Sequence, residues 1–276
     1  MREYKEHFVA FMDILGFKEL ISHETCESIF QVFHEIHNRS HASLNFNGVQ
    51  IEAYEKIQHR ILSDSVILFV ESEVEDSFAA LLNVCTRLQV SLIERENPIL
   101  LRGGISIGSL YYENDIIYGQ GLTEAYLLES KLAKYPRIVF TGNTLEKGRQ
   151  NAKYMFSYID DPFGEFSIDD DDLFYVEYLS EIQGTTLEKT KEYFDRIFNL
   201  CKKMLNSAID SNLREKYLWL KKKTEKAVEY LQQIKELYDE EKEQTLKQEM
   251  ALFHEKMKVF QHLPEQQVDG NIEGNR

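Results

Sequence analysis

The sequence predicts an α+β domain followed by long helices, and two observations support this. Strand-length apolar runs alternate with segments of helical periodicity over residues 1–184. The composition changes near Thr185: residues 187–260 contain almost no Gly or Pro and are rich in Lys, Glu, Leu and Tyr. We therefore expect a folded domain over 1–184, a helical extension over 185–262 and a disordered tail over 263–276.

The first two elements are expected to be a strand and a helix. Residues 8–13 form an apolar run of strand length that ends in an aspartate and has charged residues on both sides. Gly16 then precedes residues 17–39, where apolar residues such as Phe33 and Ile36 recur at helical spacing.

A β-hairpin is expected next. Residues 49–58 alternate apolar and polar side chains, which is typical of a half-buried strand. A second apolar strand over 61–70 follows closely and is interrupted only at 63–65. This pattern places Asp64 near the start of the hairpin.

The remaining segments alternate in the same way. Helical periodicity is expected over 74–95 and 119–133, and strands over 100–111, 116–118 and 137–141. The extension should form two long helices with a break near residues 211–212, and the acidic run 169–172 should form a solvated loop.

Charge and composition disfavour several classes of protein. The chain has 47 acidic and 32 basic residues and a net charge of −15, which opposes binding to nucleic acid or to an anionic membrane surface. No apolar stretch approaches the roughly 18–20 residues that span a bilayer, and the start lacks a secretory signal pattern. Three scattered cysteines without a Cys-x-x-Cys motif indicate reduced thiols that fill the core. We expect a cytoplasmic protein.

Two carboxylates are candidates for metal ligands. Asp13 ends the first strand and Asp64 lies at the predicted hairpin, both positions where Asp is unusual in a strand. Each could instead be an ordinary turn or capping residue. A pair of carboxylates on adjacent strands would suit Mg²⁺ or Mn²⁺, which prefer oxygen ligands and are often shared with substrate phosphates.

Three segments, in this order, resemble the motifs of class III nucleotidyl cyclases. They are FVAFMDILGFK at 8–18, RILSDSVILF at 60–69 and LRGGISIGSLYYENDIIYGQGLTEAYLLES at 101–130. The resemblance covers residues 7–145. AFMDILGF, together with REKYLWLKK from Arg214 onward, more narrowly resembles the bacterial Pycsar pyrimidine cyclases. Those enzymes make cyclic UMP or cyclic CMP as an antiphage signal that a separate effector reads.

The resemblance implies a ferredoxin-like core, an antiparallel-rich sheet with helices on one face, and two divalent cations, Mn²⁺ or Mg²⁺, per site. Asp13, Asp64 and the main-chain carbonyl of Ile14 match the metal ligands. The cations activate the ribose 3′-hydroxyl of a nucleoside triphosphate for attack on the α-phosphorus. The resemblance also implies a head-to-tail homodimer, in which one subunit supplies the carboxylates and the other supplies groups from the 119–130 helix.

The base-reading positions of the family fall on Arg60 and Gln120. Arg is a donor and Gln both a donor and an acceptor, so together they suit uracil. UTP is therefore favoured, with CTP or a purine nucleotide as alternatives. Arg60 could instead form an ordinary surface ion pair. Tyr54, on the strand expected over 49–58, could stack on a base or simply pack as a core or surface aromatic.

Two departures from the family leave a further alternative open. Its transition-state Asn and Arg fall on Thr123 and Leu127, and the acidic run 169–172 lies where the family has a basic residue. Arg102 and Arg137 are the best local substitutes because guanidinium groups match phosphate geometry. Arg102 could equally form a structural salt bridge. Without such a substitute, the chain would be a catalytically silent nucleotide-binding or interaction module.

Overall fold

The structure of the chain is a computed structural model that describes residues 2–40, 45–46, 49–153, 166–179, 187–207 and 210–233. The tail expected over 263–276 lies outside these residues. The contacts divide the chain into two units, Met1–Val228 and Glu229–Arg276. The fold and the site described below belong to the first unit.

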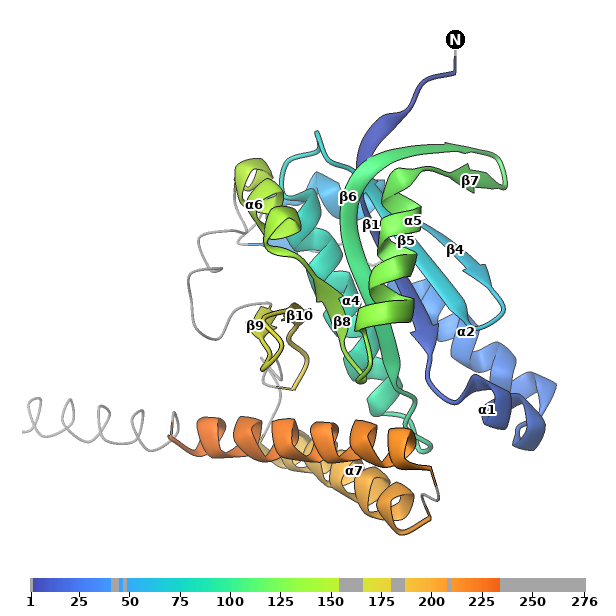
Figure 1. Cartoon of the computed structure of the whole chain (residues 1–276), viewed down its shortest axis with the longest axis vertical. Helices are drawn as coiled ribbons and strands as arrows, with labels where there is room; N and C mark the ends of the chain where they lie inside the picture. Colours follow the sequence, from blue (N-terminus) through green and yellow to red (C-terminus); the bar gives the residue numbers. More distant parts are fainter. Residues whose placement is uncertain are drawn as a thin grey trace, which may run out of the picture. The chain divides into compact units, whose positions relative to one another are not determined.

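An antiparallel-rich sheet forms the centre of the first unit (Figure 1). Its strands follow the order β4-β5-β1-β6-β8-β10-β9, and the short strand β7 pairs only with β6. β6 and β8 are the parallel pair, and the other described pairs are antiparallel. The α+β prediction is confirmed. The strands are β1 (Lys5–Ile14), β4 (Gln58–Leu62), β5 (Ser65–Glu71), β6 (Leu101–Glu113), β7 (Ile116–Tyr118), β8 (Ile138–Phe140), β9 (Phe166–Ile168) and β10 (Phe174–Val176).

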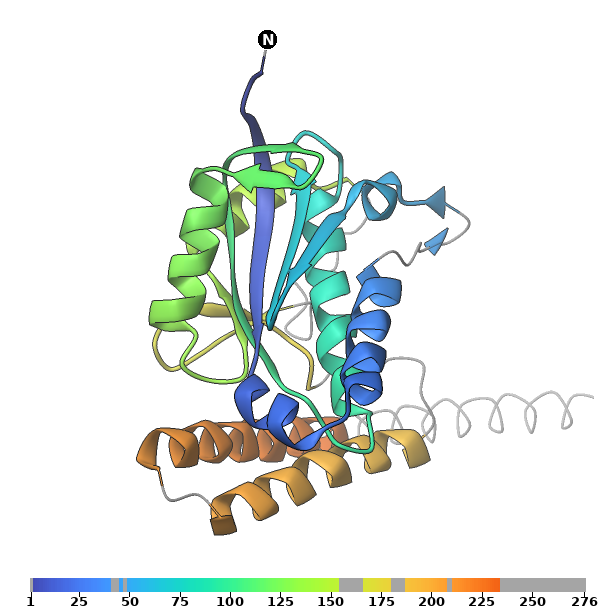
Figure 2. The same cartoon turned by 90° about the vertical axis from the view of Figure 1, so that its right-hand side faces the viewer.

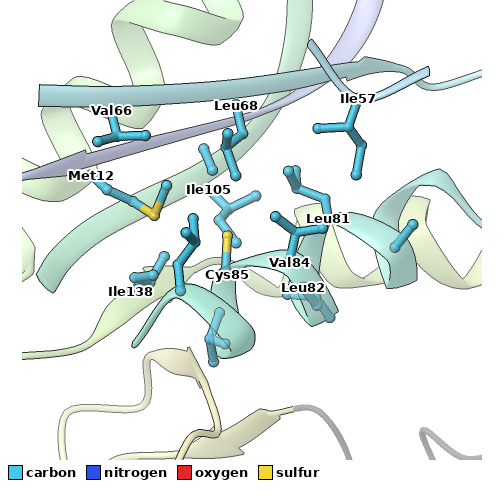
Figure 3. Close-up of a cluster of buried hydrophobic side chains, with 14 of the residues drawn as sticks. Met12, Ile57, Val66, Leu68, Leu81, Leu82, Val84, Cys85, Ile105 and Ile138 are labelled. Atoms are coloured by element: carbon cyan, nitrogen blue, oxygen red, sulfur yellow. The ribbon is translucent and has the colours of Figure 1, made fainter. Parts of the chain in front are cut away.

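The principal core lies on one face of this sheet. Alternate residues of β1, including Phe8, Ala10 and Met12, are fully buried there against α2 (Cys26–Ser40), α3 (Glu52–Lys56) and α4 (Ser77–Ile93). Figure 3 shows Met12 with side chains of β5, β6 and β8 packed against Leu81, Leu82, Val84 and Cys85 of α4. α6 (Gly142–Asn151) also contacts α4.

One helix lies on the other face. The intervening β1 residue Val9 is buried against Ala125 of α5 (Gln120–Leu127), with Phe11 and Leu122 packed around them. Figure 2 shows α5 (green) and α4 (teal) on opposite sides of the sheet. The expectation of helices on one face therefore holds for α2, α3 and α4 but not for α5.

One segment differs from the expected strand because a short apolar run fits either period. Residues 49–58 were expected to form one strand, but a helix separates Val49–Gln50 (β3), which pairs with Asn45–Phe46 (β2), from Gln58 at the start of β4. The helix is α3 (Glu52–Lys56), and its buried residues Ala53 and Tyr54 lie four and three positions before the buried Ile57, a helical spacing. The hairpin is instead formed by β4 and β5.

The helices flanking the sheet are more interrupted than expected. Residues 17–39 split into α1 (Phe17–His23) and α2, separated by the extended residue Glu24. The helix expected over 119–133 ends in a π-helical turn, η1 (Leu128–Leu132).

Of the cysteines, Cys85 and Cys201 are buried as expected, whereas Cys26 is exposed.

The extension begins with α7 (Leu187–Ser207), and residues 211–233 are helical again. The break between them lies next to the expected position at 211–212. No helix in the described part of the chain is long and apolar enough to cross a membrane.

A buried ion network fixes the second of these helices to the core. Asp169 is only 6% exposed and accepts a hydrogen bond from the Trp219 indole at 2.7 Å. It also pairs with Lys223 at 2.8 Å and with Arg137, a side chain with no exposed surface. The acidic run was expected to be a solvated loop, but its first residue is a buried anchor because three donors converge on it.

Candidate active site

Asp13 and Asp64 meet at one end of the sheet. Asp13 lies near the end of β1 and is paired in register with Ser65 at the start of β5. Asp64 lies in the β4–β5 turn, which Ser63 enters at a φ of 56°. The Ile14 N–H donates to the Asp64 carbonyl at 3.1 Å and ties this turn to the end of β1. The structure therefore brings together the two carboxylates that the sequence singled out.

The surroundings of Asp13 disfavour its negative charge. Its side chain is 19% exposed, and burial raises the pKa of Asp13 above its ordinary value. The charge of Arg102 lowers this pKa, while the neighbouring Asp64 carboxylate raises it again. Burial and the like charge together raise the pKa of Asp13 more than Arg102 lowers it. An additional positive charge, such as a bound cation, would stabilise the charged carboxylate.

Arg102 joins this pair to a third carboxylate. It faces Asp13 across the β1–β6 register, and its Nε lies 3.3 Å from the Asp13 carboxylate. Its Nη2 lies 2.8 Å from Glu129, whose side chain is 5% exposed. Arg102 thus belongs to the carboxylate cluster of its own chain, so both expected roles, phosphate binding and structural ion pairing, are open to it.

Glu129 was not among the residues selected from the sequence. Burial raises its pKa, and the charges of Asp13 and Asp64 raise it further against the lowering effect of Arg102. Glu129 lies on the π-helical turn η1, an irregularity that is frequent at functional sites. The available signal was the Glu-Ser pair that ends the third motif, here Glu129 and Ser130.

A glycine permits this arrangement. A Cβ on Gly104 of β6 would lie 2.3 Å from the Leu128 Cβ and 2.9 Å from the Glu129 backbone nitrogen. Only a residue without a side chain allows η1 to approach β6 so closely. Gly104 therefore sets the position of Glu129 relative to Arg102.

The donor set fits a divalent cation held jointly by protein and substrate. Within the described residues, no group of three or more His, Cys, Asp or Glu side chains forms a complete metal site. Asp13 and Asp64 offer carboxylate oxygens, and Ile14 offers a main-chain carbonyl beside them. Mg²⁺ commonly takes one or two carboxylates and fills its remaining positions with water and phosphate oxygens.

Gln120 lies far from these carboxylates in the same chain. Gln120 begins α5, and its neighbour Gly121 abuts Gly108 of β6. Gly108 pairs with His7 of β1, six residues before Asp13, which corresponds to about 20 Å along a strand. A single chain therefore does not combine Gln120 with these carboxylates in one site. Thr123 lies on the same helix, between Gly121 and Ala125, which packs against Gly104.

Arg60 and Gln120 each have partners of their own. Arg60 donates to the Asn114 carbonyl at 2.6 Å in the β6–β7 turn, and to the His59 carbonyl at 2.7 Å. The Gln120 amide donates to Glu124 at 2.8 Å. No hydrogen bond joins Arg60 to Gln120 in the described part of the chain.

Two expected substrate-binding residues are placed differently. Tyr54 lies on helix α3 rather than a strand and is 2% exposed in the core, so it presents no open ring face for a base. Arg137 is fully buried and pairs with Asp169 and Asp171. Both are structural here because the core and the ion network occupy them.

Comparison with known proteins gives a similarity of fold. No protein-family model and no curated protein matches the chain. The guanylyl cyclase domain of the RhoGC fusion protein from the aquatic fungus Blastocladiella emersonii is 14% identical, with a TM-score of 0.45 over 63% of this chain and 95% of that one. An adenylate/guanylate cyclase/hydrolase from Silicibacter pomeroyi is 15% identical, with a TM-score of 0.43 over 63% and 98%. The guanylyl cyclase Cya2 is 13% identical, with a TM-score of 0.42 over 67% and 98%.

Proposed function

We propose that this chain is a nucleotidyl cyclase that converts UTP to 3′,5′-cyclic UMP and pyrophosphate. The observation that supports it best is the meeting of Asp13 and Asp64, from two separate motifs, beside Arg102. In the reaction, the ribose 3′-oxygen bonds to the α-phosphorus and the bond to the departing pyrophosphate breaks. The hydroxyl proton passes to solvent.

The chain's own groups would supply positioning and charge. Asp13, Asp64 and the Ile14 carbonyl would hold the divalent cations, which neutralise the triphosphate and activate the 3′-hydroxyl. Arg102 would keep the two carboxylates in place, since it contacts Asp13 and Glu129. When the substrate binds, the same guanidinium would be placed to donate a hydrogen bond to a phosphate oxygen.

We propose further that two copies of the chain complete each site. Gln120 lies about 20 Å from Asp13 along the sheet, so it would serve the carboxylates of a partner copy together with Thr123 of the same helix. The exposed surface of α5 and β7 carries several large apolar side chains. Tyr126 is 49% exposed and Leu127 38%, and Ile116 of β7 is 63% exposed. A homodimer would cover these side chains.

The choice of UTP follows from the base-reading positions. Arg60 and Gln120 offer donors and one acceptor. Arg60 contacts Asn114 in the β6–β7 turn, two residues from the exposed Ile116, and Gln120 is exposed at the start of α5. The Pycsar resemblance supports a role for the product as an antiphage signal read by a separate effector. CTP remains the alternative substrate.

Mixed dimers test the shared site. Asp64→Ala and Gln120→Ala should each lose activity alone, and mixing the two should restore about a quarter of it, because statistical pairing forms dimers with one intact site. Arg102 is unsuitable as the second variant because it lies beside Asp13 of its own chain. No recovery on mixing would contradict the shared site.

A second candidate function rests on Leu127. An exposed apolar side chain stands where the family has an arginine, and it cannot stabilise a charged phosphate. A silent nucleotide-binding module would bind UTP saturably and release no pyrophosphate. A coupled pyrophosphate assay on the same protein separates the two functions.

A further inference from the structure

Lys216 lies on the inner face of the C-terminal helix. Residues three, four and seven positions later share its face of the helix. Trp219 is 8% exposed, Leu220 is fully buried and Lys223 is 9% exposed. Lys216 is half-buried on the same face, in the second turn of the helix. Figure 2 shows this helix (orange) below the end of β1 and below α1.

The buried ion network fixes the position of this helix. Trp219 and Lys223 both bind Asp169, and the Trp219 ring stacks on Tyr135 with centroids 5.3 Å apart and planes 3° from parallel. Lys134 forms an ion pair with Glu215, next to Lys216. These contacts hold the helix in one register, so the place of Lys216 is determined by the fold.

Lys216 lies within electrostatic range of the candidate active site. It interacts electrostatically with Arg102, Asp13 and Glu129, and with Asp210 of its own segment. It makes no hydrogen bond or ion pair with the described residues. It also lines a cavity of about 400 Å³ with Leu15 and Gly16, which directly follow the candidate metal ligands Asp13 and Ile14 in the chain. Lys203, Glu19 and Glu24 line the same cavity, whereas the carboxylates of Asp13, Asp64 and Glu129 lie outside its lining.

The charge of the site calls for such a cation. Asp13, Asp64 and Glu129 contribute three carboxylates, and Arg102 is already engaged with two of them. Even with the two proposed divalent cations and Arg102, three carboxylates and a triphosphate leave the site with net negative charge, so a further cation is favourable. An ammonium on a flexible stem at the cavity wall can supply it, since lysine binds phosphate as a mobile point charge.

We infer that Lys216, from the C-terminal helix, binds the polyphosphate chain of the substrate where this cavity adjoins the candidate metal ligands at Leu15 and Gly16. The inference rests on the proposed function for the identity of that substrate. It assigns the helical extension a direct part in the active site, through one residue that the Asp169 network positions.

The test compares Lys216→Ala and Lys216→Arg with wild type by calorimetric titration. The probes are inorganic tripolyphosphate with Mg²⁺ and 3′-deoxy-UTP, which cannot cyclise. Lys221→Ala is the matched control, because Lys221 lies on the same helix with an exposed i,i+4 partner, Glu225. Trp219 is the single tryptophan of the chain, so its fluorescence reports whether the helix stays docked in each variant.

Lys216→Ala should weaken both probes by about tenfold or more, Lys216→Arg should restore most of the affinity, and Lys221→Ala should match wild type. Equal affinity of wild type and Lys216→Ala for both probes, with helix docking unchanged, would overturn the inference. So would the absence of binding of either probe to wild type. If wild type binds both probes but forms no cyclic product from UTP, the inference stands and the proposed function fails.

Discussion

Replacing Asp169 by asparagine should strongly destabilise the first unit. The Asp169 carboxylate accepts hydrogen bonds or ion pairs from Arg137, Lys223 and Trp219. Its side chain is 3% exposed, and the side chains of Arg137 and Lys223 are 0% and 9% exposed. The neutral amide would leave two buried cations without their shared anion.

The size of the effect follows from this burial. Removing one partner of a buried ion pair costs about 3–5 kcal/mol. Arg137 keeps Asp171 as a second partner, so we expect the lower end, about 3 kcal/mol. For a unit of this size that corresponds to a melting temperature about 6–12 °C lower.

Urea unfolding followed by circular dichroism and by Trp219 fluorescence measures this change. Asp170→Asn is the matched control, since Asp170 is 76% exposed and pairs with Lys222, which is 57% exposed. That control should change the free energy of unfolding by less than about 1 kcal/mol. Equal stabilities of the two variants would refute the buried anchor.

The effect of pH gives a second check on the same residue. Burial raises the pKa of Asp169, but hydrogen bonds from Lys223, the Asp170 backbone and Trp219 and the charge of Arg137 hold it below its ordinary value of 3.8. A lowered carboxyl pKa stabilises the fold above that ordinary value, and the stabilisation is lost as pH falls through the folded-state pKa. The difference between wild type and Asp169→Asn should therefore be full near neutral pH and should shrink below about pH 4.

Three further predictions concern the candidate active site. Mn²⁺ at about 100 times its dissociation constant should stabilise wild type by about 2.7 kcal/mol in thermal unfolding and should not stabilise Asp13→Asn. The pKa of Asp13 is raised by burial and by Asp64, so protons compete with the cation for this carboxylate. The Mn²⁺ affinity measured by calorimetry should therefore rise with pH through that pKa. An affinity independent of pH from 4 to 7 would contradict this. Gly104→Ala should lower the free energy of unfolding in urea by about 1–3 kcal/mol, because the added Cβ would lie 2.3 Å from Leu128. Gly142→Ala is the control, since its Cβ would lie 3.8 Å from Phe174 and should not destabilise the fold. Equal destabilisation by the two substitutions would contradict the close packing of η1 on Gly104.

The sequence predicted the parts of the fold that depend on local pattern. The order of strands and helices and the proximity of Asp13 to Asp64 follow from apolar periodicity and from carboxylates at strand ends. The error at 49–58 arose because burial of Ala53, Tyr54 and Ile57 satisfies a helical period in a segment too short to distinguish from a strand.

The remaining parts depend on tertiary contacts. Glu129 reaches Arg102 because a π turn packs on Gly104, and Lys216 reaches the site because Asp169 anchors its helix from a distant loop. Arg137 was a reasonable phosphate ligand from its type alone. Its burial with Asp169 could not be seen until the acidic run was placed beside it.

The most direct test of the central claim is a turnover assay with four nucleotides. Purified protein with Mn²⁺ receives ATP, GTP, CTP and UTP separately, and the products are identified by mass. Cyclic UMP formed from UTP, with Asp13→Ala and Asp64→Ala inactive but folded, is the result that the site predicts. No cyclic product from any of the four, with the protein folded and dimeric, would contradict it.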